Sequence, residues 1–262
     1  MVKSLKNMGC AIFVTVRTTS KRLPKKALLK IGERPLIKIL IDRISTSKKI
    51  KKIIVCTTTD ESDDELCKYL IDNKINVFRG DNEDILNRIY RAAKRYKIQK
   101  FVVVEGDDLF CEPLLIDKTY EKLCKSNYDF LYWENLPFGV SPLGIKTSKL
   151  QEMVKKKTVK NTETGWGKLI MNSGVFKIGR LRPTNQKLMR PEIRLTIDYA
   201  EDLKLAKLLL KKLQIKFKLY DVIKVLDDNP KWVKINEKVK EKYTKNFENQ
   251  FRLHTMKGVE PN

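Results

Sequence analysis

A polar loop follows the first strongly apolar stretch of the sequence and carries five cationic and three hydroxyl side chains between Arg17 and Lys26. Arginine and lysine bind phosphate oxygens through charge-assisted hydrogen bonds. The composition of the loop therefore favours binding of a polyphosphate. A solvated basic loop is the alternative, because lysine is abundant throughout the chain. The segment has neither the G-x-x-x-x-G-K-[ST] pattern of a Walker P-loop nor the G-x-G-x-x-G pattern of a dinucleotide-binding turn.

Two aspartates stand where a metal ion could be held. Asp107 follows Gly106 after an apolar run, and Asp198 precedes a stretch of helical period. Mg²⁺ prefers one or two carboxylates together with phosphate oxygens and water. Attack on a nucleoside triphosphate must overcome charge repulsion, which a divalent ion bridging the phosphates reduces. The two aspartates are candidate Mg²⁺ ligands, although an isolated aspartate at a strand end is more often a turn residue or a helix cap.

The first half of the chain alternates short apolar runs with amphipathic stretches, which predicts successive β-α units and a mainly parallel sheet. The expected strands are residues 11–16, 53–57, 77–78 and 101–104. Apolar stripes predict a helix from Pro35 to residue 44 and others over residues 66–71, 85–93 and 200–214. Ligands bind at the carboxyl ends of the strands in such sheets, which is where the basic loop lies.

No linker or internal repeat divides the chain. We therefore predict a single catalytic domain over residues 1–240 and a charged C-terminal tail over residues 241–262. The only histidine, His254, lies in this tail and is expected to be exposed, which disfavours a histidine-dependent mechanism. Glycine and proline cluster over residues 137–144 and 165–174, which predicts short, partly antiparallel strands joined by loops where a substrate lid would lie.

The chain has 55 Lys and Arg residues against 32 Asp and Glu, a formal net charge of +23 that attracts polyanions. The lysines are scattered and form no arm or aromatic-interleaved stripe, which disfavours specific nucleic-acid binding. Five cysteines without a C-x-x-C pair argue against a zinc site or a disulfide framework. The sequence shows no long apolar span and no secretory signal, so we expect a cytoplasmic protein without a membrane partner.

The stretch V-R-T-T-S-K-R-L-P-K-K, followed by G-E-R-P-L, resembles the opening signature of the cytidylyltransferase family that makes CMP-activated acidic sugars. That signature is roughly A-R-x-x-S-x-R-L-P-x-K with G-x-x-P-[LM] after it. The similarity is greatest to the branch named after the spore coat polysaccharide synthesis protein F. Further segments agree in order and spacing, namely F-R-G with D-I-L-N-R, E-G-D, R-L-T-I-D-Y-A-E-D-L and N-P to I-N. The resemblance covers about residues 10 to 237.

This resemblance implies a Rossmann-like three-layer α/β nucleotidyltransferase fold, glycosyltransferase-A-like, with a mainly parallel central sheet. It also implies transfer of a cytidylyl group from CTP to a small acidic acceptor, release of pyrophosphate, Mg²⁺ as cofactor and a homodimer. The acceptor stays open between a nonulosonic acid, a Kdo-like sugar acid and a phosphonate. A nucleotide-sugar glycosyltransferase of polysaccharide synthesis and a non-enzymatic polyanion-binding module are the rival functions, and R-L-P-x-K favours nucleotidyl transfer.

The resemblance also assigns roles by position. It implies that Arg17, Lys26 and Asp107 are catalytic and that Asp107 and Asp198 bind the metal. The residues expected to contact the nucleotide are Arg17, Ser20, Arg22, Lys26, Arg79, Asp84, Arg88 and Glu105. The block from Arg79 to Arg88 is equally consistent with an ordinary helix start whose first acid is a cap.

The acceptor pocket is the least determined part. Candidate walls are Trp133, Phe138 and Trp166, although large aromatic side chains are more often simply packed. The chain departs from the branch after G-D, where Asp108 could alter the metal site or lie in solvent. A second departure, over residues 162–167, replaces an E-H-V-T segment and suggests a different acceptor pocket.

Overall fold

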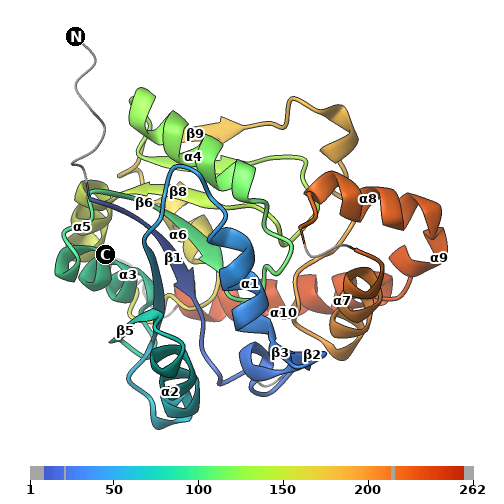
Figure 1. Cartoon of the computed structure of the whole chain (residues 1–262). Helices are drawn as coiled ribbons and strands as arrows, with labels where there is room; N and C mark the ends of the chain where they lie inside the picture. Colours follow the sequence, from blue (N-terminus) through green and yellow to red (C-terminus); the bar gives the residue numbers. More distant parts are fainter. Residues whose placement is uncertain (1–8, 21, 214–215, 257–262) are drawn as a thin grey trace.

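The computed structural model describes residues 9–20, 22–213 and 216–256, with side chains described up to residue 251. A seven-stranded sheet lies at its centre (Figure 1). Its strands are β1 (Cys10–Thr15), β4 (Ile53–Thr58), β5 (Asn76–Gly80), β6 (Lys100–Glu105), β7 (Phe130–Trp133), β8 (Leu143–Lys146) and β9 (Ile178–Leu181). Their order is β5-β4-β1-β6-β8-β7-β9, and β8 runs antiparallel to its neighbours. A separate ribbon pairs β2 (Lys30–Ile31) with β3 (Arg34–Pro35).

Helices cover both faces of the sheet. They are α1 (Leu36–Ile44), α2 (Asp64–Asp72), α3 (Ile85–Arg95), α4 (Pro113–Lys125), α5 (Thr147–Lys156), α6 (Trp166–Asn172), α7 (Ala200–Lys212), α8 (Leu219–Asp228), α9 (Pro230–Val233) and α10 (Glu237–Met256). One core lies under α1, α2, α4, α7 and α8, and the other under α3, α5 and α6. The predicted three-layer α/β fold with a mainly parallel sheet is confirmed. Within the described part of the chain, no helix combines the length and hydrophobicity that a bilayer span requires.

The central strand β1 shows why the sheet is buried on both faces. Ile12 and Val14 face one core, Ala11 and Phe13 face the other, and all four side chains are fully buried. A strand covered on both faces is apolar at successive positions instead of alternating with polar residues. This is the reason that short continuous apolar runs predict the parallel strands correctly, with ends that differ by a few residues.

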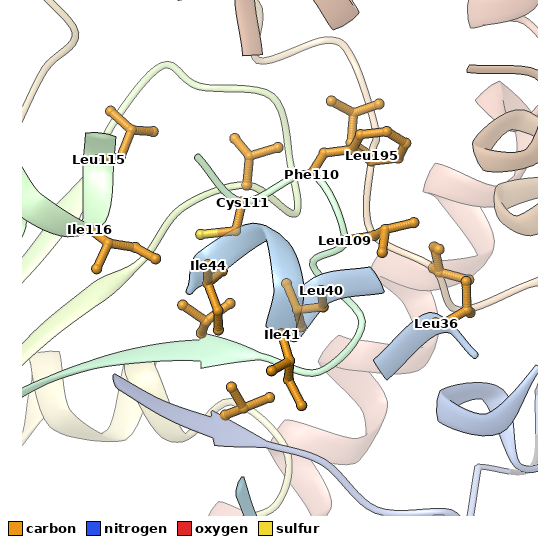
Figure 2. Close-up of a cluster of buried hydrophobic side chains, with 14 of the residues drawn as sticks. Leu36, Leu40, Ile41, Ile44, Leu109, Phe110, Cys111, Leu115, Ile116 and Leu195 are labelled. Atoms are coloured by element: carbon orange, nitrogen blue, oxygen red, sulfur yellow. The ribbon is translucent and has the colours of Figure 1, made fainter. Parts of the chain in front are cut away.

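One core also fixes the segment after β6. Figure 2 shows Leu40 and Ile44 of α1 in the same cluster as Leu109, Phe110 and Cys111. These three residues are buried, and they come directly after the two aspartates at the end of β6. Apolar packing of this kind holds the backbone of the aspartate-bearing turn in one position.

Two local expectations differ from the structure. The first helix begins at Leu36 and not at Pro35, because Pro35 has extended backbone angles and pairs with Lys30 in the ribbon. The stripe expected on α2 includes Ile71, which is 62% exposed. The short α2 buries the other members of its stripe, Leu66 and Leu70, whereas Ile71 lies on the solvent side of the helix.

The strand order creates a crevice at one edge of the sheet. From β1 the chain moves outward to β4 and β5, and it then returns to β6 on the other side of β1. The carboxyl ends of β1 and β6 therefore flank a topological switch point, the usual ligand site of open α/β sheets. Gly106 allows the two ends to approach, because a Cβ atom at this position would lie 2.7 Å from the Cβ atom of Val16.

A buried carboxylate ties the loop after β1 to the end of β4. Asp63 is fully buried and accepts hydrogen bonds from the backbone N–H and hydroxyl of Thr18, at 2.7 and 2.6 Å. It also accepts from the hydroxyl of Thr57 at 2.6 Å and from the N–H of Thr58 at 3.0 Å. Burial alone would raise the pKa of Asp63, but these bonds hold it below its ordinary value of 3.8.

We predict that Asp63→Ala lowers the free energy of unfolding by about 3 kcal/mol, because several buried donors lose a charged acceptor. Urea denaturation followed by tryptophan fluorescence measures this. Since the folded pKa is depressed, the contribution of Asp63 is present above pH 3.8 and is lost as the pH falls through the lower folded value. The matched control is Asp64→Ala, at a side chain that is 60% exposed. Equal losses in the two variants would contradict the structural role of Asp63.

Candidate active site

Lysine 26 joins the loop after β1 to the two predicted metal ligands. It begins the short 3-10 helix η2 (Lys26–Leu28), and its ammonium group donates to Asp107 and, at 2.9 Å, to Oδ1 of Asp198. The Lys26 side chain is only 14% exposed. Burial would lower its pKa, but the two carboxylates raise it above 10.5, so the side chain is a fixed cation. The structure thus brings together three residues that are far apart in the sequence.

Asp198 is held by two further cations. Arg22 Nη2 lies 2.8 Å from its Oδ1, and Arg194 Nη2 lies 3.0 Å from its Oδ2. Burial opposes ionisation of Asp198, but the charges of Lys26 and Arg22 lower its pKa. Asp202 lies near the start of α7 and holds Arg194 and Asp198 in place. Its carboxylate accepts hydrogen bonds from Arg194 Nε and from the backbone N–H of Asp198, both at 3.0 Å.

Three acids gather at the end of β6. Glu105, Asp107 and Asp108 each place one carboxylate oxygen within 4.8 Å of the others. Glu105 is exposed to the cleft, where the surrounding protein atoms reduce the hydration of its carboxylate; this effect and the Asp107 charge raise the pKa of Glu105 to about 7. Asp108 is buried, which raises its pKa well above the usual range, so the expectation that it could lie in solvent is wrong. The residues present fit Mg²⁺, because they supply hard oxygen donors and crowded negative charge that a divalent cation would offset.

A cleft of about 880 Å³ opens over these residues. This volume lies in the range typical of small-molecule sites. The predicted site residues that line it are Arg17, Ser20, Arg22, Lys26, Arg88, Glu105, Trp133, Phe138, Trp166, Asp107 and Asp198. Their roles toward a nucleotide, a metal or an acceptor stay predictions. The arrangement places cations, carboxylates and aromatic side chains around one common space.

Glu163 connects two of the predicted arginines. Its carboxylate lies 3.4 Å from Arg17 Nε and accepts a hydrogen bond from Arg88 Nη2. The side chains of Arg88 and Glu163 are 1% and 6% exposed. Burial raises the pKa of Glu163 against the pull of the two arginines. The motifs that predict the arginines did not identify Glu163, although it lies in the segment that departs from the branch pattern.

Two predicted nucleotide contacts, Arg79 and Asp84, have their partners outside the cleft lining. Arg79 donates to the backbone oxygens of Thr58 and Asp60, each at 2.8 Å, and so stabilises the turn after β4. Asp84 is the N-cap of α3 and accepts from the backbone N–H of Asn87 at 3.1 Å. Of the two interpretations of this block, the structure favours the capping acid for Asp84.

The aromatic candidates differ in their surroundings. Trp133 is buried and donates its indole N–H to Thr119 Oγ1 at 2.8 Å. Trp166 donates to Glu105 Oε1 at 2.9 Å and thereby orients one acid of the cluster. Phe138 is 44% exposed, and its ring centroid lies 5.2 Å from that of Tyr243. Phe138 therefore offers an open aromatic surface, whereas the two tryptophans are buried.

Helix α10 forms a wall of the cleft that the sequence did not predict. It runs from Glu237 to Met256 and so crosses residue 240, where the sequence analysis placed the start of a tail. The lining residues that it supplies are Tyr243, Asn246, Phe247 and Gln250. The side chain of His254 lies outside the described residues. Aromatic residues at positions 243, 247 and 251, spaced as one face of a helix, were the signal that could have revealed this wall.

Comparisons with known proteins identify the family to which the chain belongs. The chain is 37% identical over 236 residues to an uncharacterized protein of Methanocaldococcus jannaschii, covering 87% of this chain and 95% of that protein. It is 26% identical to the spore coat polysaccharide biosynthesis protein SpsF of Bacillus subtilis, covering 76% of this chain and 85% of the relative. A solved structure of a cytidylyltransferase from Leptospira borgpetersenii shares the fold, with a TM-score of 0.79 at 24% identity over 86% of this chain and 97% of that one. The family model named Cytidylyltransferase matches residues 11–220, and the chain therefore belongs to the cytidylyltransferase family.

Proposed function

We propose that the enzyme transfers CMP from CTP to a small acidic acceptor and releases pyrophosphate, with Mg²⁺ as cofactor. The observation that carries this proposal is the meeting of Lys26 with Asp107 and Asp198 at the floor of a cleft that Arg17 also lines. Family membership supports cytidylyl transfer. The identity of the acceptor is part of the proposal.

In this reaction an oxygen of the acceptor attacks the α-phosphorus of CTP, the bond from that phosphorus to the bridging oxygen breaks, and pyrophosphate leaves. Arg17, Arg22 and Lys26 line the cleft and would bind the phosphate oxygens. Asp107 and Asp198 would hold Mg²⁺, which when bound reduces the repulsion between acceptor and phosphate. The side chains act by positioning and by charge, so no covalent intermediate on the protein is required.

The relative named for spore coat polysaccharide biosynthesis supports a role in making an activated precursor of a polysaccharide. A glycosyltransferase would use a related fold but would release a nucleoside diphosphate or monophosphate. Pyrophosphate as the product therefore separates the two functions. A polyanion-binding module would release neither product.

The direct test incubates the protein with each of CTP, UTP, ATP and GTP and a pool of sugar acids and phosphonates. Pyrophosphate is measured enzymatically and CMP conjugates by mass. We expect conjugate formation with CTP at a rate about 100-fold above the other nucleotides, because a site that pairs with the base edge leaves buried groups unpaired with the wrong base. Removal of divalent ions with EDTA should reduce the rate to background, and added Mg²⁺ should restore it. Nucleoside diphosphate release, or no dependence on CTP, would refute the proposal.

A further inference from the structure

The inward face of α10 lies beside the proposed reaction centre. Tyr243, Asn246, Phe247 and Gln250 line the cleft at the helical spacing of three and four residues. The Tyr243 ring centroid is 5.7 Å from the guanidinium carbon of Arg22, the same side chain that pairs with Asp198 at 2.8 Å. The α-phosphorus must lie next to the metal ligands during the reaction. The first half of this face therefore borders the space from which an acceptor attacks.

Contacts at both ends hold α10 in this position. Tyr243 packs on Phe138 and also lies under Arg194, whose guanidinium carbon is 4.7 Å from the ring centroid. Asn246 Nδ2 donates to the hydroxyl of Tyr199 at 3.2 Å. Further along, the helix approaches the start of α6 so closely that a Cβ atom on Gly165 would lie 2.4 Å from the ring of Phe251. Helix α10 thus extends from the side of α7 to the side of α6 (Figure 1).

The side chains on this wall suit a hydroxylated anion. Asn246 and Gln250 carry amides that can both donate and accept hydrogen bonds. Lys168 of α6 lines the same space, with its ammonium nitrogen 4.7 Å from the centroid of Phe247. An ammonium group beside an aromatic face can pair with one anionic group of a ligand, and the aromatic rings that line the cleft can pack against its carbon atoms.

In the part of the chain that the structure describes, the side of the cleft formed by α6 and α10 also lacks a carboxylate that could pair with a cationic ligand. The described lining residues from α6 and α10 include a lysine, two amides and aromatic side chains, and none of them is a carboxylate. The acids closest to this wall are already engaged. Glu105 accepts the indole N–H of Trp166 and belongs to the acid cluster at the end of β6, and Glu163 is paired with Arg17 and Arg88. An ammonium group on the acceptor would therefore meet Lys168 without a compensating charge, which disfavours binding.

We infer that α10 and the start of α6 form the acceptor subsite, in which Lys168, Asn246 and Gln250 determine specificity for a hydroxylated anion that carries no ammonium group. This inference rests on the proposed function. The family model ends at residue 220, before α10 begins. The α10 side of the subsite, with Asn246 and Gln250, therefore lies outside the matched region, whereas α6, the basic loop and the aspartates lie within it.

The test uses steady-state kinetics with the whole chain and Mg²⁺. The probes are 3-deoxy-manno-octulosonate, N-acetylneuraminate and the matched pair 2-hydroxyethylphosphonate and 2-aminoethylphosphonate, which differ in a hydroxyl against an ammonium. The variants are Lys168→Met, Asn246→Ala and Gln250→Ala. The controls are Lys245→Met and Asn249→Ala, at exposed positions of α10 that do not line the cleft. Direct titration of each variant with Mg²⁺ and CTP measures nucleotide binding separately.

We expect each subsite variant to raise the KM for the acceptor about tenfold, because each substitution removes one hydrogen bond to a charged or polar group of the acceptor. The KM for CTP and kcat should stay within about twofold of wild type, and both controls should behave as wild type. The wild type should conjugate a sugar acid, and it should use 2-hydroxyethylphosphonate better than 2-aminoethylphosphonate.

The inference is overturned if the subsite variants keep the wild-type acceptor KM, or if the ammonium-bearing phosphonate is used at least as well as its hydroxyl counterpart. It is also overturned if CTP binds but none of the hydroxylated acids is conjugated. That last result leaves nucleotide binding by the proposed site intact. Absence of CTP binding, in contrast, refutes the proposed function itself.

Discussion

Replacement of Asp107 by asparagine is expected to lower kcat about a thousandfold while the fold is retained. Asp107 ends the turn after β6 and meets the ammonium group of Lys26 in the cleft. Asparagine has the same shape but removes the negative charge that a divalent cation requires. Electrostatic stabilisation by a bound metal is worth several kcal/mol, and roughly 1.4 kcal/mol corresponds to a factor of ten in rate. Pyrophosphate release at saturating CTP and Mg²⁺ measures the loss.

The control for this variant is Asp72→Asn, at an exposed position in the last turn of α2. Both substitutions change the net charge of the chain by the same amount. An equal fall in kcat in the two variants would therefore reflect the overall charge of the protein and not the active site. The circular dichroism spectrum of the Asp107→Asn variant should match the wild type, and its urea midpoint should fall less than that of Lys26→Ala, because Lys26 keeps Asp198 as a partner. Turnover at the wild-type rate in the variant would remove Asp107 from the reaction.

Lys26→Ala has the second large expected effect, and it should change both catalysis and metal dependence. We expect kcat/KM for CTP to fall about 10²- to 10³-fold, because the cation proposed to bind the phosphates is lost. Asp107 and Asp198 also lose their shared partner, and removing one member of a buried ion pair costs about 3 kcal/mol or more. The variant should therefore have a lower Tm than wild type in the absence of divalent ions.

Magnesium should compensate for part of this loss. A ligand that binds only the folded state stabilises it in proportion to RT ln(1 + [L]/Kd), so Mg²⁺ should raise the Tm of the variant more than that of the wild type. The matched control is Lys25→Ala, since Lys25 pairs with Glu65 where both side chains are more than 60% exposed, at 63% and 62%. Ion pairs between exposed side chains contribute little to the free energy of unfolding. A variant Tm that does not respond to Mg²⁺ would contradict the idea that these acids hold a cation.

The parallel strands and the loops at their carboxyl ends could be predicted from the sequence. The parallel strands appear as apolar runs because both faces of the sheet are covered, as Ile12 and Phe13 of β1 illustrate. Once the strands are known, the carboxyl ends of β1 and β6 are the expected ligand site. The loop that holds Lys26 and the turn that holds Asp107 follow these two strands, so their meeting is a consequence of strand order.

The remaining features depend on packing that local patterns do not encode. Helix α10 has an aromatic face at positions 243, 247 and 251, but only its contacts with Phe138, Gly165 and Lys168 show that this face packs over the cleft. Glu163 belongs to no motif, and its position follows from the two arginines that surround it. Arg79 lies opposite Thr57 in the register between β4 and β5 and bonds the turn that follows β4, a geometry set by strand pairing.

The order of the cleft walls along the chain has a consequence for synthesis of the protein. Ribosomes make a chain from its N-terminus, and the strands of the sheet are complete by Leu181. Helix α10, which carries Tyr243 and Phe247, is synthesised later, after α7, α8 and α9. A nascent polypeptide can assemble its hydrophobic layers while the cleft is still open on one side. Ligand capture by the finished cavity is therefore postponed until α10 has left the ribosome and packed against the sheet domain.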